Sequence, residues 1–243
     1  MVILNIGMPR SGTLWRYKLV RDLVIAAGGK DGAQIRKQYL LHPFYWELNS
    51  HIDTLSNRRL PISMYPSFLG ETYVLNTHAN PTKFVVRNME KGRIKAVYGF
   101  RDPRDCILSM LDYGKKDNPN LSSTQFQNLK SLEQAADYMQ TFLNIWEQWT
   151  AIPETLVLKY EDQLEDYDNF LKKIVDYLDM DIAPELVDQV IAQYPPREPA
   201  KDGARTHFSK GIAHRYKTEF NPEQQAYLIE RFGPVLEKMG YET

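Results

Sequence analysis

Residues 7–13 read Gly-Met-Pro-Arg-Ser-Gly-Thr and have the composition of a loop that binds phosphate. They follow the apolar run 2–4 and precede a helical pattern, so a strand would end in a glycine-containing loop and continue as a helix. In that arrangement backbone N–H groups converge on one point, and the helix dipole favours an anion there. The pattern therefore predicts an anion site at the start of the chain.

This loop differs from the nucleotide triphosphate motif G-x-x-x-x-G-K-[ST] at two positions. Gly7 and Gly12 have the spacing of the two glycines, but Thr13 replaces the lysine, and Leu14 replaces the hydroxyl residue that binds Mg²⁺. The cation is instead Arg10, inside the loop. These differences favour a phosphorylated donor bound without a metal over ATP.

Polar residues also stand where three further apolar runs end. The runs are 73–76, 94–100 and 155–159, and they are followed by Thr77-His78, Arg101-Asp102 and Tyr160-Glu161. Because the carboxyl ends of parallel strands meet at one edge of a sheet, we expect these residues to converge with the loop at 7–13. A histidine, with an ordinary pKa of about 6.5, suits a general base near neutral pH.

Strand patterns alternate with helical patterns along the chain, which predicts an α/β fold with a doubly wound parallel sheet. The expected strands are 2–6, 73–76, 94–100 and 155–159, and the expected helical segments are 13–27, 103–113, 132–150, 161–193 and a final helix from Pro222. Asp102 is the expected N-cap and Pro103 the first residue of its helix. We expect a single domain over 1–243, with a central parallel sheet flanked by helices and a P-loop-like nucleotide-binding core.

Two segments have no clear periodicity. Residues 30–70 are rich in aromatic side chains and contain Pro43, Pro61 and Pro66, which we expect to interrupt them into short helices and loops. We expect this segment to contribute to an acceptor pocket. Residues 195–220 carry a local excess of Lys and Arg and are the expected lid over an anionic donor.

Composition limits the classes of function. The net charge of −1 argues against nucleic acid or an anionic membrane as the main partner. The single cysteine, Cys106, excludes an intrachain disulfide and a thiolate metal cluster. No apolar stretch approaches the roughly 20 residues that cross a bilayer, and the first residues lack a signal-peptide pattern, so a cytoplasmic location is expected.

Taken together, these segments resemble the PAPS-dependent sulfotransferases, which transfer a sulfonate from 3′-phosphoadenosine 5′-phosphosulfate (PAPS) to an acceptor hydroxyl or amine and release the bisphosphate PAP. Residues 9–15 are similar to the family's P-K-S-G-T-T-W loop, and residues 101–109 to its R-x-P-x-D-x-x-x-S motif. Thr77-His78 matches its T-H, and Tyr160-Glu161-Asp162 its Y-E-D. Residues 209–217 are similar to its C-terminal R-K-G-x-x-G-x-W-K segment.

The resemblance implies a donor site in two parts and a reaction without a metal. His78 would be the catalytic base, and Arg10 would stabilise the charge on the leaving oxygen. The implied cofactor-binding residues are Pro9, Arg10, Ser11, Gly12, Thr13, Leu14, Trp15, Arg101, Ser109, Tyr160, Ser209, Lys210 and Gly211. Trp15 would stack on the adenine, with packing in the core as the competing interpretation.

The chain departs from the family pattern at three positions. Arg10 replaces a lysine, and Asn76 stands where many members have a second lysine before T-H. Ser209 replaces the arginine for the 3′-phosphate, and Arg205 or Arg215 is a candidate substitute. Two other functions stay open: a small-molecule or nucleotide kinase on the same scaffold, and a non-catalytic nucleotide-binding protein.

Overall fold

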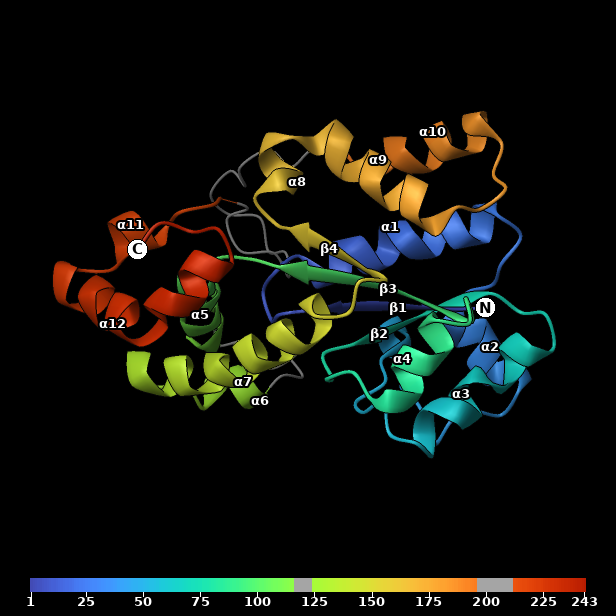
Figure 1. Ribbon diagram of the computed structural model, residues 1–243, viewed down its shortest axis with the longest axis horizontal. Helices are drawn as coiled ribbons and strands as arrows, with labels where there is room; N and C mark the ends of the chain where they lie inside the picture. Colours follow the sequence, from blue (N-terminus) through green and yellow to red (C-terminus); the bar gives the residue numbers. More distant parts are fainter. Residues whose placement is uncertain (116–123, 196–211) are drawn as a thin grey trace. The chain divides into compact units, whose positions relative to one another are not determined.

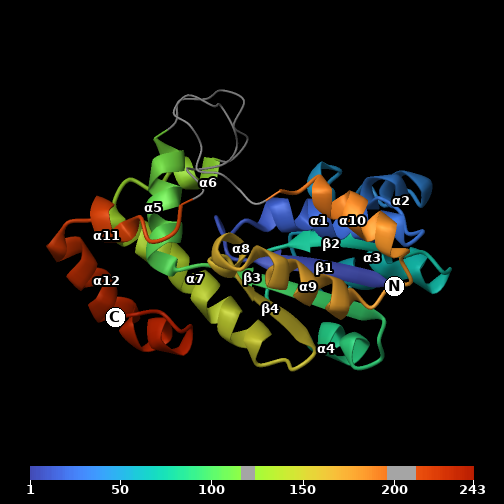
Figure 2. The same cartoon turned by 90° about the horizontal axis from the view of Figure 1, so that it is seen from above.

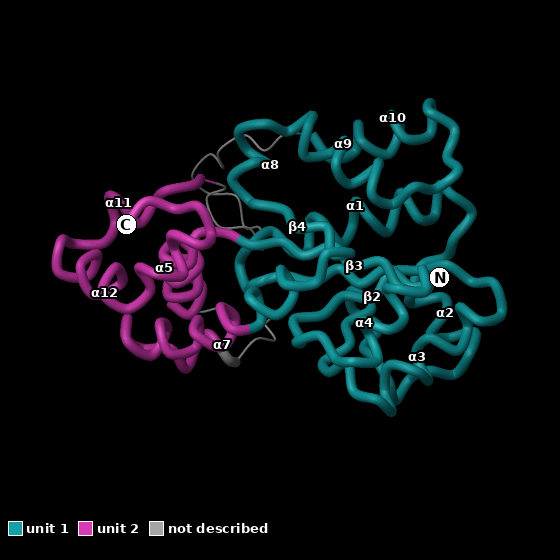
Figure 3. Tube along the Cα trace, viewed as in Figure 1, with its two compact units in different colours: residues 1–100, 145–196 teal, residues 101–144, 197–243 magenta. Residues whose placement is uncertain are grey.

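The structure is a computed structural model that describes residues 1–115, 124–195 and 212–243. Its chain divides into two compact units (Figure 3), which comprise residues 1–100 with 145–196 and residues 101–144 with 197–243. The first unit contains the sheet, and the described part of the second is built from helices. Within the described ranges, no helix has both the length and the apolar character needed to span a bilayer.

A four-stranded parallel sheet in the order β2-β1-β3-β4 forms the centre of the first unit. Its strands are β1 (Val2–Gly7), β2 (Tyr73–Thr77), β3 (Ile94–Phe100) and β4 (Thr155–Lys159). This arrangement confirms the expected α/β class with a central parallel sheet. Because β2 and β3 lie on opposite sides of β1, the winding reverses at β1, and ligands of such sheets bind at the carboxyl ends of the strands there.

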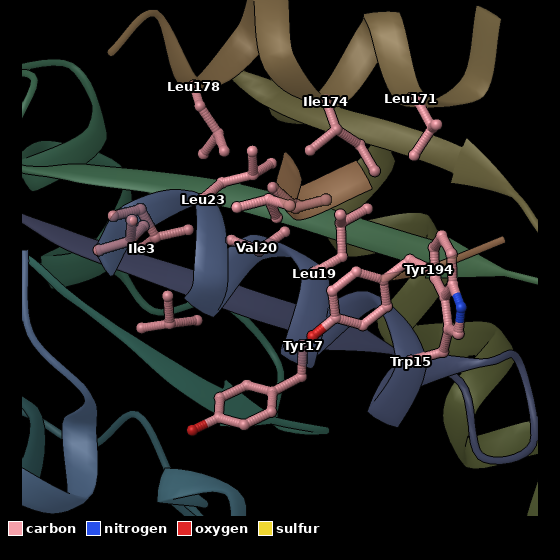
Figure 4. Packing of buried hydrophobic residues seen from close by; sticks show 14 of the residues in the cluster. Ile3, Trp15, Tyr17, Leu19, Val20, Leu23, Leu171, Ile174, Leu178 and Tyr194 are labelled. Atoms are coloured by element: carbon pink, nitrogen blue, oxygen red, sulfur yellow. The ribbon is translucent and has the colours of Figure 1, made fainter. Parts of the chain in front are cut away.

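One face of the sheet is covered by α1 (Thr13–Ala26), α9 (Tyr167–Leu178) and α10 (Pro184–Ala192), and α10 packs along α1 (Figures 1 and 2). Leu19, Val20 and Leu23 of α1 share one apolar cluster with Ile174 and Leu178 of α9 (Figure 4). Their spacing of three and four residues places them on one side of each helix. Burial of this cluster fixes α1, and with it the loop that precedes α1, on the sheet.

The opposite face carries α4 (Lys83–Met89) and the last residues of α7 (Leu132–Thr150). Side chains alternate along β3, so Val97 joins the α1 cluster while Tyr98 and Phe100 point the other way. Tyr98 packs against Trp149 and Phe100 against Trp146, with ring centroids 6.5 and 6.0 Å apart. The indole of Trp149 donates a hydrogen bond to the carbonyl oxygen of Ala79 at 3.0 Å, which holds the segment after β2 in place.

Between α1 and β2 the chain forms short helices, as expected. These are α2 (Gly32–Gln38), η1 (Leu48–Ser50) and α3 (Arg59–Phe68). Contrary to expectation, Pro61 and Pro66 do not interrupt this region but lie within α3. Pro61 is in the first turn, where no N–H has an intrahelical partner, so its missing donor costs little. Pro66 lies beyond the first turn and leaves one carbonyl of α3 without its usual intrahelical donor.

The helices of the second unit are α5 (Pro103–Gly114), α6 (Thr124–Gln127), the greater part of α7, α11 (Tyr216–Glu219) and α12 (Pro222–Lys238). Of these, α5, α7 and α12 match predicted helical segments, whereas the short α6 and α11 were not predicted. Asp102 caps α5 as predicted, because its carboxylate accepts a hydrogen bond from the Arg104 N–H at 2.9 Å. The predicted helical segment 161–193 contains α9, α10 and the short α8 (Asp162–Glu165).

Candidate active site

The loop between β1 and α1 is shaped by two residues with left-handed backbone. Arg10 has φ of 67° and Gly12 has φ of 75°. A left-handed conformation is ordinary for glycine but costs about 1 kcal/mol or more for other residues, and such strain concentrates at functional sites. Arg10, the cation that the sequence predicts for the donor site, therefore has a strained backbone.

The N-terminus of α1 is open toward an anion. No side chain of the described residues caps it, and its first turn contains no acidic residue. The first backbone hydrogen bond of the helix runs from the Arg16 N–H to the Gly12 carbonyl oxygen at 3.1 Å. The N–H groups of residues 13–15 therefore precede the helical hydrogen-bond pattern, and the helix dipole favours negative charge beside them.

The hydroxyls of Ser11 and Thr13 point into the protein. Ser11 Oγ donates toward the carbonyl oxygens of Met8 and Gly99, at 2.8 and 3.1 Å, and Ser11 is only 1% exposed. Thr13 Oγ1 donates to the Met8 carbonyl oxygen at 3.2 Å. These contacts fix the shape of the loop, so the predicted donor contacts of both residues would use backbone groups. Sequence alone did not indicate this orientation.

Tyr160 supports the loop from β4. Its backbone N–H donates to the Phe100 carbonyl oxygen at 2.8 Å, which continues the β3–β4 pairing by one residue. A Cβ placed on Gly12 would lie 3.0 Å from Cδ2 of the Tyr160 ring. Gly12 is thus required both by its backbone conformation and by the ring beside it.

Trp15 lies in the apolar cluster of Figure 4 and is 7% exposed. Its ring centroid lies 6.1 Å from Tyr167 and from Phe170, and 5.8 Å from Tyr194. Leu14 is partly buried against the same cluster. Both side chains therefore have a packing role, and the stacking of Trp15 on an adenine stays a prediction.

His78 follows the last residue of β2 and lies beside the start of the loop. Its Nδ1 is 2.6 Å from the carbonyl oxygen of Gly7. Since a carbonyl can only accept a hydrogen bond, Nδ1 carries the proton and the neutral ring has its lone pair on Nε2. Burial lowers the pKa of His78 to about 4, the hydrogen bond to Gly7 opposes that shift, and the charges of His51 and Arg16 add to it. His78 is therefore in the neutral form that a base requires.

Arg16 was not identified from the sequence as a site residue. It is 3% exposed, and its guanidinium donates to Asn5 Oδ1 at 2.9 Å and to the Ile6 carbonyl oxygen at 2.5 Å. Burial lowers its pKa to about 10, so it stays charged at neutral pH. The signal was present, because a charged residue three and four positions before Leu19 and Val20 falls on the apolar side of the predicted helix.

Asn76, at the position where many family members have lysine, belongs to the same network. Asn5 Nδ2 donates to Asn76 Oδ1 at 2.8 Å and to the Thr13 carbonyl oxygen at 3.1 Å. Asn5 therefore links β2 to the first turn of α1. Its remaining oxygen accepts the hydrogen bond from Arg16.

In the second unit, Arg101 is held by residues of α5 and of the segment before α11. It is 4% exposed, and its Nη2 donates to Asp105 Oδ2 at 2.9 Å and to the Ile212 carbonyl oxygen at 2.8 Å. The other oxygen of Asp105 accepts from the Tyr216 N–H at 3.0 Å. Asp105 thus orients the arginine that the sequence assigned to the 3′-phosphate. Ser109, assigned to the same phosphate, is buried on α5.

Arg215, a candidate substitute for the missing arginine of the C-terminal motif, is paired with two carboxylates, and its phosphate contact stays a prediction. Its guanidinium contacts the carboxylates of Asp112 at 2.5 Å and Glu219 at 2.9 Å and is already neutralised by them. Arg205, the other candidate, lies outside the described residues. So do the predicted donor contacts Ser209, Lys210 and Gly211, and the greater part of the predicted lid at 195–220.

A groove of about 530 Å³ opens in the first unit between α1, the start of α2 and η1. Its lining includes Tyr17, Arg21, Asp31, Glu47 and Leu48, so both charges and an apolar side chain are present. Three of these residues belong to the segment 30–70 that the sequence assigned to an acceptor pocket. Among the described residues, no group of three or more His, Cys, Asp or Glu side chains is placed to hold a metal ion.

Comparison with known proteins decides the family. The profile of the Sulfotransferase domain matches residues 2–240. The chain belongs to the sulfotransferase family. Sulfotransferase 2A6 of Mus musculus is 26% identical over 214 residues, covering 83% of this chain and 67% of the relative. Sulfotransferase 6B1 of Danio rerio is 19% identical over 242 residues, covering 95% and 76%.

A solved structure shares the fold of this sulfotransferase. Mouse sulfotransferase SULT7A1 complexed with PAP aligns with a TM-score of 0.60 at 18% identity, covering 97% of this chain and 83% of that one. The expectation of a PAPS-dependent sulfotransferase with a P-loop-like core is confirmed. The roles of single residues and the acceptor stay predictions.

We predict that Gly12→Ala weakens both the fold and PAP binding. The alanine would hold a left-handed conformation and press its Cβ against the Tyr160 ring, so the free energy of unfolding should fall by about 2 kcal/mol. Displacement of the loop should lower the affinity for PAP at least about tenfold. Urea unfolding and titration calorimetry measure the two effects.

Gly28→Ala is the matched control. Gly28 follows α1 with φ of 81°, and a Cβ there would meet nothing within 4 Å. This variant should lose about 1 kcal/mol of unfolding free energy and keep its PAP affinity. Equal loss of affinity in both variants would contradict the assigned role of Gly12.

We predict that His78 titrates near pH 4 in the folded protein, well below the ordinary value of about 6.5. Because the unfolded chain then binds the proton more tightly, the free energy of unfolding should fall as the pH drops from about 6.5 toward 4. Ring signals in NMR spectra give the pKa, and His78→Gln assigns the signal and should remove that part of the pH dependence. A folded-state pKa near 6.5 would contradict the burial of the His78 ring.

Proposed function

We propose that this sulfotransferase moves the sulfonate of PAPS in line to a hydroxyl or amine of an acceptor, with His78 as the general base. The observation that carries this proposal is the position of His78, whose Nδ1 lies 2.6 Å from the Gly7 carbonyl at the start of the anion loop. The base and the group to be transferred would thus share one edge of the sheet. The reaction needs no metal at any step.

In the proposed transfer one proton moves, one bond to sulfur forms and another bond to sulfur breaks. The acceptor oxygen or nitrogen attacks sulfur and gives its proton to Nε2 of His78, and a new bond to sulfur forms. The bond between sulfur and the bridging oxygen of the 5′-phosphate breaks, and its electron pair remains on that oxygen. The products are the sulfated acceptor and PAP.

Arg10 and the N-terminus of α1 are proposed to stabilise the leaving oxygen. Negative charge grows on that oxygen as the bond to sulfur breaks, so a cation and N–H groups placed there act more strongly in the transition state than in the ground state. The guanidinium of Arg10 stays protonated, so its role is electrostatic and it does not donate a proton.

The rest of the chain fits the same proposal. Arg101, oriented by Asp105, would bind the 3′-phosphate together with Ser109, since a guanidinium matches the geometry of phosphate oxygens. The groove beside residues 31–48 is the proposed acceptor pocket, in a single sulfotransferase domain that extends over 1–243 and closes with a lid at 195–220. A cytoplasmic location belongs to this proposal as well.

Neither alternative function has a specific observation in its favour. A kinase would bind Mg²⁺ through a hydroxyl at position 14, where this chain has leucine. A non-catalytic nucleotide-binding protein would not need a neutral histidine beside the loop, where this chain has His78.

We predict that PAP binds this protein in the presence of a chelator and that ATP with Mg²⁺ binds more weakly. Titration calorimetry with the two ligands on the same preparation measures the difference. Preference for ATP with Mg²⁺ would support the kinase instead. Binding of PAP without turnover on a broad panel of hydroxyl and amine acceptors would support the non-catalytic protein.

We predict that His78→Gln lowers kcat by about 10² to 10⁴, the range that a general base contributes, while PAP affinity changes by less than about threefold. Sulfate transfer from radiolabelled PAPS to an accepted substrate measures kcat. His42→Gln, which replaces an exposed histidine of the same unit, is the control. Full activity of His78→Gln would remove His78 from the mechanism.

A further inference from the structure

The guanidinium of Arg16 occupies a slot between the ends of β1 and β3 that two glycines keep open. Gly7 and Gly99 are paired across these strands. A Cβ on Gly7 would lie 2.7 Å from Arg16 Nη2, and a Cβ on Gly99 would overlap the guanidinium itself. Both strands therefore lack a side chain at the point where the cation lies, directly beneath the loop at 8–12.

Nothing acidic neutralises this cation within the described parts of the chain. Its hydrogen bonds go to Asn5 and to the Ile6 carbonyl, and no Asp or Glu of the described residues lies within 4.0 Å of it. The other deeply buried arginines are different, since Arg101, Arg104 and Arg215 each contact a carboxylate. A buried charge without a counter-charge is unfavourable, and proteins keep one where a ligand or partner supplies the opposite charge.

The position of Arg16 indicates where that counter-charge would be. It lies one turn after the loop end of α1, and its hydrogen bond to Ile6 ties it to the last residues of β1. Its positive charge is also the smallest of the causes that lower the pKa of His78, at the end of the neighbouring strand β2. In an interior of low dielectric constant such a charge acts over several ångströms with little screening.

We propose that Arg16 is a second cation of the anion loop, held behind it rather than inside it, and that the anion bound at residues 9–13 is its counter-charge. The inference rests on the proposed function for the identity of that anion, the 5′-phosphosulfate of PAPS. It adds a residue that the sequence motifs do not contain. Arg16 acts through the field it creates and through the backbone it holds, so it is a positioning residue.

The network around Arg16 explains why the chain tolerates Asn76. The resemblance places a lysine at position 76 in many members, whereas Asn76 here is neutral and bonded to Asn5. Asn5 in turn accepts from Arg16, so the three side chains form one connected unit. Arg16 of α1 thus supplies the positive charge that a lysine at position 76 of β2 would provide.

The test compares Arg16→Met, Arg16→Gln and Arg16→Lys with wild type and with Lys18→Met, which removes an exposed cation from the same helix. Two anions serve as probes in titration calorimetry: inorganic pyrophosphate, which needs only the loop, and PAP. Arg16→Met and Arg16→Gln should weaken both at least about tenfold, Arg16→Lys and Lys18→Met by less than about threefold. In parallel, NMR should show a higher pKa of His78 in the two neutral variants, measured without any ligand.

Several outcomes would overturn the proposal. Wild-type affinity for pyrophosphate in Arg16→Gln would do so, and an equal loss in Arg16→Lys would indicate that shape, not charge, is needed. An unchanged pKa of His78 would show that the charge does not reach the loop. If Arg16→Met fails to fold, the comparison of Arg16→Gln with Arg16→Lys decides. If the wild-type protein bound pyrophosphate but not PAP, the assignment of the anion as PAPS would be refuted. The role of Arg16 in binding an anion would still be supported.

Discussion

The parallel pairing of β1 with β2 on one side and β3 on the other is the constraint on which the site depends. It brings the ends of three strands to one edge, and the register places Ile6 opposite Thr77 and Gly7 opposite Gly99. The residue after Thr77 is the proposed base, and the residues after Gly7 form the anion loop. Neither group could reach the other if β1 were paired in an antiparallel sense, because the two chain ends would then lie at opposite edges.

Three groups around the anion loop carry positive charge. The uncapped end of α1, Arg10 and the buried Arg16 are positive or partly positive, and His78 is held neutral beside them. Burial of Arg16 alone costs several kcal/mol, and its hydrogen bonds each return only about 1.5 to 3 kcal/mol. The loop is therefore preorganised for an anion at a cost in stability. The apolar cluster between α1 and α9 provides the burial that offsets this cost.

The fold was predictable because its signals are local. Each strand is an apolar run that ends at a glycine-containing loop or is followed by polar residues, and the N-cap of α5 follows from the chemistry of Asp102 and Pro103. Most of the predicted donor loop was readable in the same way. The directions of side chains were not: the inward hydroxyl of Ser11 and the core position of Trp15 result from packing between segments far apart in the sequence. Arg16 was missed because a sequence motif specifies residue types at fixed positions along the chain. The place of its guanidinium depends on Gly7 and Gly99, which belong to two different strands.

The lowered pKa of His78 has to be reconciled with its proposed role as a base, since a ring that protonates only near pH 4 attracts a proton weakly. The causes of the shift resolve this. Part of it comes from the positive charge of Arg16, and an anion bound at the loop acts on His78 with the opposite sign. Donor binding would thus raise the basicity of His78 at the moment when an acceptor proton must be removed, and the charge of PAP would stabilise the imidazolium that results. Coupling of this kind would make the proposed base stronger in the complex where transfer can occur than in the free protein.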